Sequence, residues 1–229
     1  MTREQKNDYE KLIDYVEEQL VGNQLKIGDK LPAERELSAM LSISRNSVRT
    51  GLSVLEAIGV INNKHGSGNY INGAYDYKLT QVMMMMYALD DITNREVSGL
   101  RYAAELQAIM LAPQNITERQ KSLLMNYLDI MENSHSMEEQ THCDKMIHQT
   151  IVEASGNRLI IANYMALNRI LDTVIGEVRR KVSKQPASTF EEFQFTHRQL
   201  VEFVCQGDYE KAKEALDKHL EYMLAEINT

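Results

Sequence analysis

The amino-acid sequence predicts a mainly α-helical protein made of two domains. Apolar residues recur at helical spacing over most of the 229 residues. Only the segment VINNKHGSGNYI, residues 60–71, alternates around a central Gly-Ser-Gly, which predicts a β-hairpin. No strand pattern follows Ile71 in the sequence. We therefore expect residues 1–73 to form a small domain of three helices and a hairpin, residues 74–78 a linker, and residues 79–229 an all-helical antiparallel bundle.

Three helices are expected before the hairpin. Leucine, isoleucine and valine at helical spacing predict the first over residues 7–22, which stops at Gly22. After a turn, Pro32 suits the start of a second, short amphipathic helix. Ser44 can cap the N-terminus of the third helix, and Gly59 can end it. The second and third helices are therefore separated by only a tight turn.

The larger domain is expected to contain helices alone. Gly156, Pro186 and Gly207 interrupt the helical pattern, and Thr117 with Gln120 has the form of a capping box at a helix start. The predicted helices cover residues 79–90, 93–112, 117–133, 136–155, 158–184, 189–206 and 208–227.

Composition and charge restrict the class of protein. The N-terminal stretch is charged throughout, unlike a signal peptide, and the longest apolar cluster is far shorter than the roughly 20 residues of a membrane span. The two cysteines have no CxxC spacing, so we expect a cytoplasmic protein with no disulfide framework and no membrane partner. The net charge of −8 argues against nucleic acid as a general partner, but residues 45–70 carry Arg45, Arg49 and Lys64 against Glu56, a net of +2.

The N-terminal pattern has the form of a winged helix-turn-helix, in which two short helices and a hairpin read DNA. The second of the two helices fits the major groove, and the hairpin touches backbone or minor groove. The segment SRNSVR places hydrogen-bond donors at the first turns of that helix, and Lys64 with His65 lies at the hairpin tip beside Gly66. This part of the chain is therefore expected to bind double-stranded DNA.

The run LPAERELS, SRNSVR, LEAIGVI and GSGNYI resembles the DNA-binding domain of the GntR family of bacterial transcription regulators. The resemblance covers residues 7–72 without gaps. Two other interpretations remain open, because Arg35 could pair with Glu34 or Glu36, and a helix-turn-helix can also dock a protein. The DNA contacts that the resemblance implies are Arg35, Ser44, Arg45, Asn46, Arg49, His65 and Gly66.

A second constellation lies in the predicted bundle. Asp144 and His148 are four residues apart and so share one face of a helix. His197 and His219 lie in two later amphipathic helices, and their separation matches a helix, a turn and a return. Three imidazoles and a carboxylate could form a site for zinc, nickel, manganese or iron with coordination positions left open. From the spacing alone, an ion pair and ordinary core histidines remain open, and a single interior histidine is more often a core residue than a ligand.

The same segments resemble the effector-binding helical domain, called FCD, of the FadR-type branch of the GntR family. The resemblance implies that Asp144, His148, His197 and His219 bind a divalent transition metal, zinc first among them, and that the ion anchors a small carboxylate effector. Arg101 matches an arginine of the domain's opening helix. It could hold that carboxylate, or it could form an i,i+4 pair with Glu105. His135, His142 and Cys143 are not expected to be ligands.

The function predicted from these segments is that of a homodimeric, ligand-responsive transcription regulator. It would bind a pseudo-palindromic operator and would act as a repressor that the carboxylate effector releases. One alternative is a metal-free regulator whose histidines bind an organic effector directly. A metalloenzyme is a third interpretation, but the sequence offers no evident general base or nucleophile beside the site, so we predict no enzymatic activity.

Overall fold

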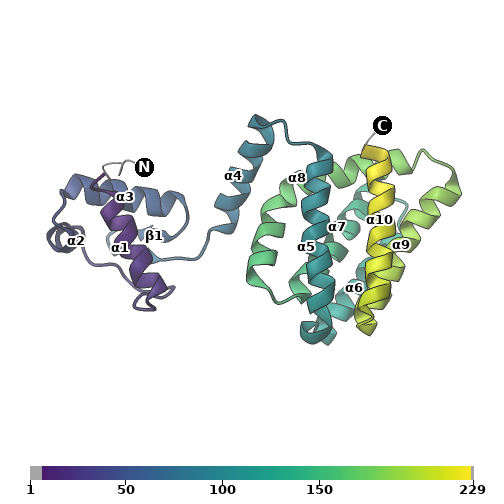
Figure 1. The fold of residues 1–229 in the computed structure, drawn as a ribbon, viewed down its shortest axis with the longest axis horizontal. Helices are drawn as coiled ribbons and strands as arrows, with labels where there is room; N and C mark the ends of the chain where they lie inside the picture. Colours follow the sequence, from purple (N-terminus) through teal and green to yellow (C-terminus); the bar gives the residue numbers. More distant parts are fainter. Residues whose placement is uncertain (1–6, 228–229) are drawn as a thin grey trace, which may run out of the picture. The chain divides into compact units, whose positions relative to one another are not determined.

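The computed structural model describes residues 7–227 and confirms the mainly α-helical fold (Figure 1). The chain divides into two compact units, Met1–Leu79 and Thr80–Thr229. The division falls within helix α4, which begins at Asp76, inside the segment 74–78 predicted as a linker. The elements in chain order are α1 (Glu10–Val21), α2 (Glu34–Leu41), α3 (Arg45–Ala57), β1 (Ile61–Lys64), β2 (Gly68–Ile71), α4 (Asp76–Leu89), α5 (Asn94–Asn115), α6 (Glu118–Asn133), α7 (Met137–Ala154), α8 (Arg158–Val182), α9 (Ala187–Gln206) and α10 (Tyr209–Ile227).

The N-terminal unit packs α1 and α2 against α3, with the hairpin beside α3. Gly51 of α3 lies so close to α1 that an added Cβ would be 2.9 Å from Leu12 Cδ2 and 3.0 Å from the Tyr9 carbonyl. Any larger residue at this position would push the two helices apart. The core of the unit is apolar, and its buried members are Leu12, Val16, Leu31, Leu37, Ile43, Val48, Leu52, Leu55, Ile61 and Ile71.

Local polar contacts fix the turn between α2 and α3. Ser42 takes the left-handed conformation at the end of α2, and the Ser38 hydroxyl donates to the Ile43 carbonyl at 2.6 Å. Ser44 then caps α3, because its Oγ accepts from the Ser47 N–H at 3.0 Å. The predicted cap is therefore confirmed. The strands β1 and β2 pair antiparallel, from Ile61 opposite Ile71 to Lys64 opposite Gly68, which places His65 and Gly66 in the connecting turn.

In the larger unit, α7 occupies the centre and contacts α5, α6, α8 and α9. The helices α9 and α10 lie side by side and return on each other through Gly207, which adopts a positive φ of 75°. The capping box of Thr117 and Gln120 forms as predicted. Helix α5 continues to Asn115, beyond its predicted end at residue 112, because Pro113 lies in the last turn and removes only one helical hydrogen bond there.

The core of the larger unit is formed largely by apolar residues of α5 to α10. Helix α8 contributes the largest apolar share, and its Tyr164, Leu171 and Val174 are fully buried. Among the described residues, no single helix is long and apolar enough to cross a membrane. Only the two parts of α8, Arg158–Leu167 and Arg169–Val182, pass that test together, and they meet at a bend of 63°.

Candidate DNA-reading surface and buried metal site

The residues predicted to read DNA lie exposed around the start of α3. Arg45 and Asn46 occupy its first turn, and Arg49 follows one turn later on the exposed side. The Arg49 Nε donates to Glu34 Oε2 at 2.8 Å, an exposed ion pair that joins α3 to α2. Exposed guanidinium and amide groups at the N-terminus of a helix can reach base edges and phosphates together.

The remaining predicted DNA contacts surround this helix. Arg35 is exposed in the first turn of α2, while Glu36 accepts from the Ala33 N–H and Glu34 pairs with Arg49. The Ser44 hydroxyl is engaged in capping α3. His65 and Gly66 are exposed at the hairpin tip, and Gly66 adopts a φ of 73° with open space around its Cα. A backbone of this kind can approach a phosphate closely.

The four predicted metal ligands come together from three helices. Asp144 and His148 lie on α7, His197 on α9 and His219 on α10, and all four side chains are at most 2% exposed. One donor atom from each lies within 4.8 Å of every other. Bonds of about 2.0–2.1 Å to one tetrahedral zinc ion place ligand atoms roughly 3.3 Å apart, so these atoms would have to draw somewhat closer together to bind an ion. Residues that are 75 positions apart in the sequence, Asp144 and His219, therefore face one small volume.

Neighbouring groups fix which nitrogen His148 and His219 turn toward this volume. The Nδ1 of His148 donates to Glu105 Oε2 at 2.8 Å, so its Nε2 carries a lone pair. The Thr196 hydroxyl donates to the Phe193 carbonyl at 2.7 Å, so its oxygen accepts from His219 Nδ1 at 3.2 Å. The His219 Nε2 therefore also carries a lone pair that is free to bind a metal ion. Such outer contacts orient histidines that bind metal.

His197 has more acceptors around it than a neutral imidazole can serve. Its Nδ1 lies 3.2 Å from the Phe193 carbonyl, and its Nε2 lies 3.1 Å from Asp144 Oδ2. A neutral ring has one proton, so one of these contacts places two lone pairs opposite each other. A cation shared by Nε2 and Asp144 would remove this conflict.

Other unpartnered atoms point to the same volume. Among the described residues, Asp144 Oδ1, His148 Nε2 and His219 Nε2 are buried without a hydrogen-bond partner. Leaving a buried polar atom unpaired costs about 1–3 kcal/mol. Three such atoms that face one another are what a metal site without its ion presents, so these residues fit a divalent ion.

Asp144 also contacts a buried arginine that the sequence analysis did not single out. Arg179 of α8 donates from Nη1 to Asp144 Oδ2 at 2.8 Å and from Nη2 to Gln194 Oε1 at 3.1 Å. The signal for it was present, because Arg179 lies four residues after Ile175 and three before Val182, which are both buried. A charged residue on the apolar face of a helix indicates a buried partner.

Arg101 forms one of the two contacts that its sequence context allowed, the pair with Glu105, and the role in binding a carboxylate stays a prediction. Its Nε donates to Glu105 Oε1 at 2.7 Å, which is the predicted i,i+4 pair. Its Nη2 lies 3.7 Å from Asp144 Oδ1 and has no hydrogen-bond partner among the described residues. Beside it lies a cavity of about 10 Å³, enough for one water, lined in part by Ser98 and His219. Arg101 is therefore held by Glu105 and still presents a free N–H to the site.

Burial and neighbouring charges set the ionisation of the cluster. Burial opposes ionisation of Glu105, but Arg101 and His148 outweigh it and lower its pKa to about 2. Burial likewise opposes ionisation of Asp144, but His197 and Arg179 hold its pKa well below the ordinary value. Burial lowers the pKa of His197 and, further, that of His219, so both imidazoles are neutral at neutral pH. Neutral imidazoles and an ionised carboxylate are the forms that bind metal.

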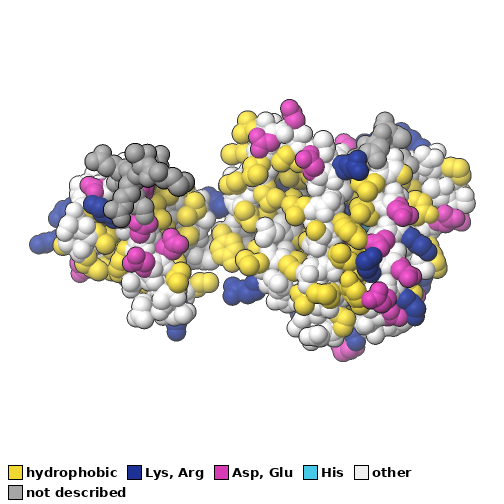
Figure 2. Space-filling model, viewed as in Figure 1, with side chains coloured by type: hydrophobic (Ala, Val, Ile, Leu, Met, Phe, Trp, Pro, Cys, Tyr) yellow, Lys and Arg dark blue, Asp and Glu magenta, His cyan; other side chains and the backbone are white. Residues whose placement is uncertain are grey.

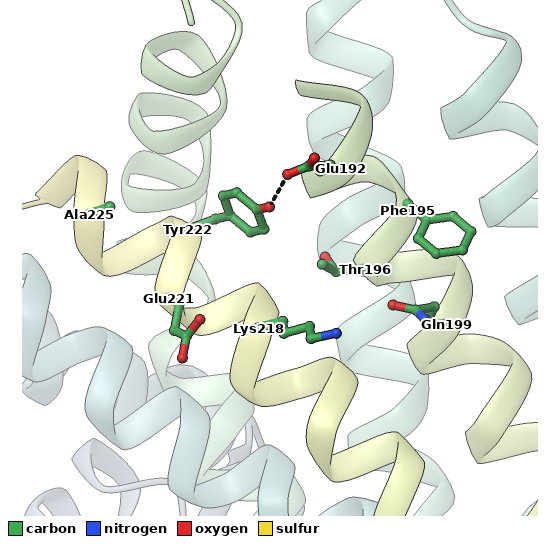
Figure 3. A pocket seen from close by; sticks show the side chains of 8 residues that line it. All are labelled: Glu192, Phe195, Thr196, Gln199, Lys218, Glu221, Tyr222 and Ala225. Atoms are coloured by element: carbon green, nitrogen blue, oxygen red, sulfur yellow. Dashed lines mark hydrogen bonds between the residues drawn. The ribbon is translucent and has the colours of Figure 1, made fainter. Parts of the chain in front are cut away.

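A surface pocket of about 560 Å³ opens between α9 and α10 (Figure 3). Thr196, which orients His219, lines this pocket, while Glu192 and Tyr222 join across it through a hydrogen bond of 2.7 Å. The other histidines considered, His135 and His142, are exposed, and Cys143 is buried beside Asp144 with its thiol pKa raised by burial.

Comparison with known proteins gives matches along most of the chain. The family described as FCD domain matches residues 96–222, and the family described as bacterial regulatory proteins, gntR family, matches residues 8–71. The transcriptional regulator YcbG of Bacillus subtilis is 28% identical over 211 residues, which cover 91% of this chain and 84% of YcbG. The transcriptional repressor NanR of Salmonella newport is 28% identical over 223 residues, which cover 92% of this chain and 83% of NanR.

A solved structure shares the fold. The structure titled Streptococcus agalactiae GntR superimposes with a TM-score of 0.66 and 19% sequence identity, covering 93% of this chain and 97% of that one. At this identity the likeness concerns the fold alone. It nevertheless agrees with the order of a helix-turn-helix unit followed by a helical unit that both family matches give.

Proposed function

The chain belongs to the GntR family of bacterial regulatory proteins and carries an FCD domain, and on this premise we propose that it is a repressor released by a small carboxylate effector. As a member of this family it is a DNA-binding transcription regulator, not an enzyme. The proposal of repression is supported by the relative NanR, whose name is that of a repressor. We place its action in the cytoplasm, on double-stranded DNA.

The observation that carries the proposed effector site is the buried set of four donors. His148 and His219 present lone pairs, Asp144 is ionised, and His197 has one acceptor too many. We propose that these four residues hold one divalent ion, with zinc first and nickel, manganese or iron as alternatives. Such an ion supplies a positive charge and open positions for a carboxylate. Arg101 Nη2 would then donate to that carboxylate from beside the ion.

We propose further that the regulator is a homodimer on a pseudo-palindromic operator, with one α3 helix in each half-site. Exposed apolar side chains support a subunit interface on the larger unit. Figure 2 shows such side chains gathered over α4 and α5, where Met85 is 62% and Leu89 is 80% exposed. An effector that prefers one arrangement of the bundle would change the spacing of the two reading helices and so lower operator affinity.

The experiment that tests the metal site is elemental analysis of protein purified without a histidine tag or chelator. We expect about one equivalent of a transition metal per chain, lost in His197→Ala and in His219→Ala. His142→Ala is the matched control, because His142 is exposed on α7 and should leave the metal content unchanged. No metal in the parent, even after incubation with zinc, nickel or manganese, would refute the site.

The regulatory function is tested on DNA. An operator is first selected from a random duplex library with the full chain, and its binding is then titrated with small carboxylic acids with metal present. Release of the operator by an acid, lost in Arg101→Gln, is the expected result. Binding that no acid alters, in protein that holds its metal, would contradict effector control through this site.

One observation favours a second candidate, a regulator that binds an organic effector without metal. Asp144 already has a cationic partner in Arg179, with an Nη1 to Oδ2 distance of 2.8 Å. The carboxylate is thus neutralised by the protein itself. If chelators leave acid-induced release of the operator unchanged, this second candidate is correct and the histidines bind the effector directly.

A further inference from the structure

Arg179 is the largest fully buried side chain among the described residues, and its position decides what can enter the site. Its Nη1 contacts Asp144 Oδ2, the oxygen that His197 Nε2 also approaches. Its Nη2 is held by Gln140 Oε1 at 3.3 Å and by Gln194 Oε1 at 3.1 Å, while its Nε has no partner among the described residues. The guanidinium therefore contacts the carboxylate that a metal ion would need, through Oδ2, while Oδ1 has no hydrogen-bond partner within the described part of the chain.

The buried charges of the site cancel without any ion. Asp144 and Glu105 are two carboxylates, Arg101 and Arg179 are two guanidiniums, and all four residues are at most 2% exposed. Adding a divalent ion to this set leaves two uncompensated positive charges in a medium of low polarity. Such charge is costly unless an anion accompanies it.

The ion and Arg179 also compete for the same carboxylate. An ion bound by Asp144 and the three histidines would lie within a few ångströms of a guanidinium that now contacts Oδ2 at 2.8 Å. Like charges at this distance repel strongly where water is absent. Arg101 is different, because Glu105 holds it at 2.7 Å and its Nη2 stands 3.7 Å from Asp144.

We propose that a divalent ion and a small dianionic acid, one with two carboxylates, enter this site as a set without net charge, and that the ion releases Arg179 from Asp144 to bind the acid. The proposal rests on the proposed function and names its effector class. Arg179 serves as the cation of the site when no ion is bound. Once released, it offers the acid a planar fork of donors opposite Arg101, so one carboxylate can meet each arginine.

The space around Arg179 agrees with this exchange. The cavity that Arg101 lines holds about 10 Å³, which is too little for a diacid, so some side chain has to move to admit one there. Gln140, which accepts from Arg179, also lines a surface pocket of about 400 Å³ between the start of α7 and the start of α9. Departure of the guanidinium from Asp144 would open room next to that pocket.

The first test measures metal affinity in Arg179→Gln by competition with a chromophoric chelator. Because the variant lacks the competing charge, we expect it to bind zinc about tenfold more tightly than the parent, or more. A residue that merely holds Asp144 in place would give the opposite result, weaker zinc binding, and that result would overturn the proposal. Arg180→Gln is the matched control, since Arg180 is the next residue of α8 and is exposed. It should leave the affinity unchanged.

The second test uses the parent protein and so does not depend on how the variants fold. Malonate and succinate are titrated against propionate and L-lactate by calorimetry, with protein that has been loaded with zinc and freed of excess ion. We expect the dianions to bind at least about tenfold more tightly than the monoanions, and only to loaded protein. Equal or tighter binding of the monoanions would overturn the proposal.

Arg179→Lys completes the experiment. It keeps the positive charge but loses the fork, so zinc affinity should stay near that of the parent while malonate affinity falls about tenfold. Malonate binding that equals the parent's would show that Arg179 does not contact the acid. Failure of the parent to bind zinc would refute the metal site of the proposed function itself, whereas zinc binding with the wrong order of affinities would refute only this inference.

Discussion

The two units of this protein place their functional residues in opposite surroundings. In the N-terminal unit, Arg45, Asn46 and Arg49 are exposed on a helix whose buried face is wholly apolar. In the larger unit, Asp144 and the histidines around it are buried, and the contacts of Asp144 are to other buried ionisable groups such as His197 and Arg179. Exposed functional groups can change without cost to the fold, whereas buried ionic groups contribute to function and stability together. Substitutions of the exposed residues in the N-terminal unit should therefore change DNA binding alone, whereas substitutions of the buried ones in the larger unit should change both function and stability.

The largest expected effect is on the stability of the larger unit. Asp144→Ala leaves Arg179 buried without its carboxylate, which should cost about 3–5 kcal/mol of unfolding free energy. Chemical denaturation followed by circular dichroism measures this loss. The double substitution Asp144→Ala with Arg179→Met is the control, since removing both charges should recover much of the stability. A single substitution that costs under about 1 kcal/mol would contradict the view that this pair is a stability element.

The N-terminal unit should give the opposite result. Arg45→Ala is expected to weaken binding to a selected operator by about 1–3 kcal/mol, or roughly fivefold to 150-fold, and to leave the free energy of unfolding unchanged. Fluorescence anisotropy with labelled operator measures the first quantity, and a melting curve measures the second. If the melting midpoint falls along with the affinity, Arg45 belongs to the fold and the contrast between the two units fails.

The same contrast explains what could be predicted from the sequence. The helices, the hairpin, the Ser44 cap and the Thr117 capping box follow from residues a few positions apart, and they are confirmed. The spacing of the four candidate ligands left a metal site open, the resemblance to the FCD domain selected them, and the structure brings them together. Arg179 was missed because its partner Asp144 lies 35 residues away, and no local pattern states which buried charge meets which. Long-range ionic partners come from tertiary packing alone.

Acid should weaken the larger unit more than the smaller one. Burial lowers the pKa of His197 and His219 below the ordinary 6.5, so the stability that depends on their neutral forms is fully present above pH 6.5 and is lost as the pH falls below 6.5 toward the lowered pKa values. The pKa of Glu105 is lowered from 4.5 to about 2. The stability that its ionised form contributes to the fold is therefore fully present above pH 4.5 and is lost as the pH falls from 4.5 to about 2.

Two measurements on metal-free protein at pH 7.5 and pH 5.0 check this. Thermal unfolding gives the overall loss of stability, and native-state hydrogen exchange reports on each unit separately. We expect the amides of α7, α9 and α10 to lose protection at pH 5.0 while those of α1 and α3 keep theirs. Because His197 and His219 would be protonated in the unfolded chain at pH 5.0, equal protection in α9 and α10 at both pH values would mean that these two histidines titrate alike in the folded and unfolded states.

A smaller effect is expected from the helix cap of the reading unit. Ser44→Ala removes the oxygen that accepts from the Ser47 N–H, which should cost about 1 kcal/mol of stability in the N-terminal unit. Ser44→Asp restores an acceptor and should restore the stability, but it places a negative charge where DNA phosphates are expected, so operator affinity should fall. Compared with Ser44→Ala, Ser44→Asp should then be more stable but bind the operator less tightly. This is expected if capping needs only an acceptor at residue 44 while DNA binding depends on its charge.

The smallest expected effect concerns the ion pair between Glu34 and Arg49. Both side chains are exposed, 37% and 69% respectively, so Glu34→Gln should change stability by less than about 1 kcal/mol. The pair nevertheless occupies the Arg49 Nε, which could otherwise donate to a phosphate, and the negative charge of Glu34 would repel a phosphate nearby. Operator affinity should therefore rise severalfold in Glu34→Gln. The gain should be largest at low salt, because salt screens the repulsion between the exposed Glu34 carboxylate and the DNA phosphates. Unchanged affinity at every salt concentration would mean that Arg49 and Glu34 stay paired on DNA, so that Arg49 positions α2 against α3 and leaves base reading to Arg45 and Asn46.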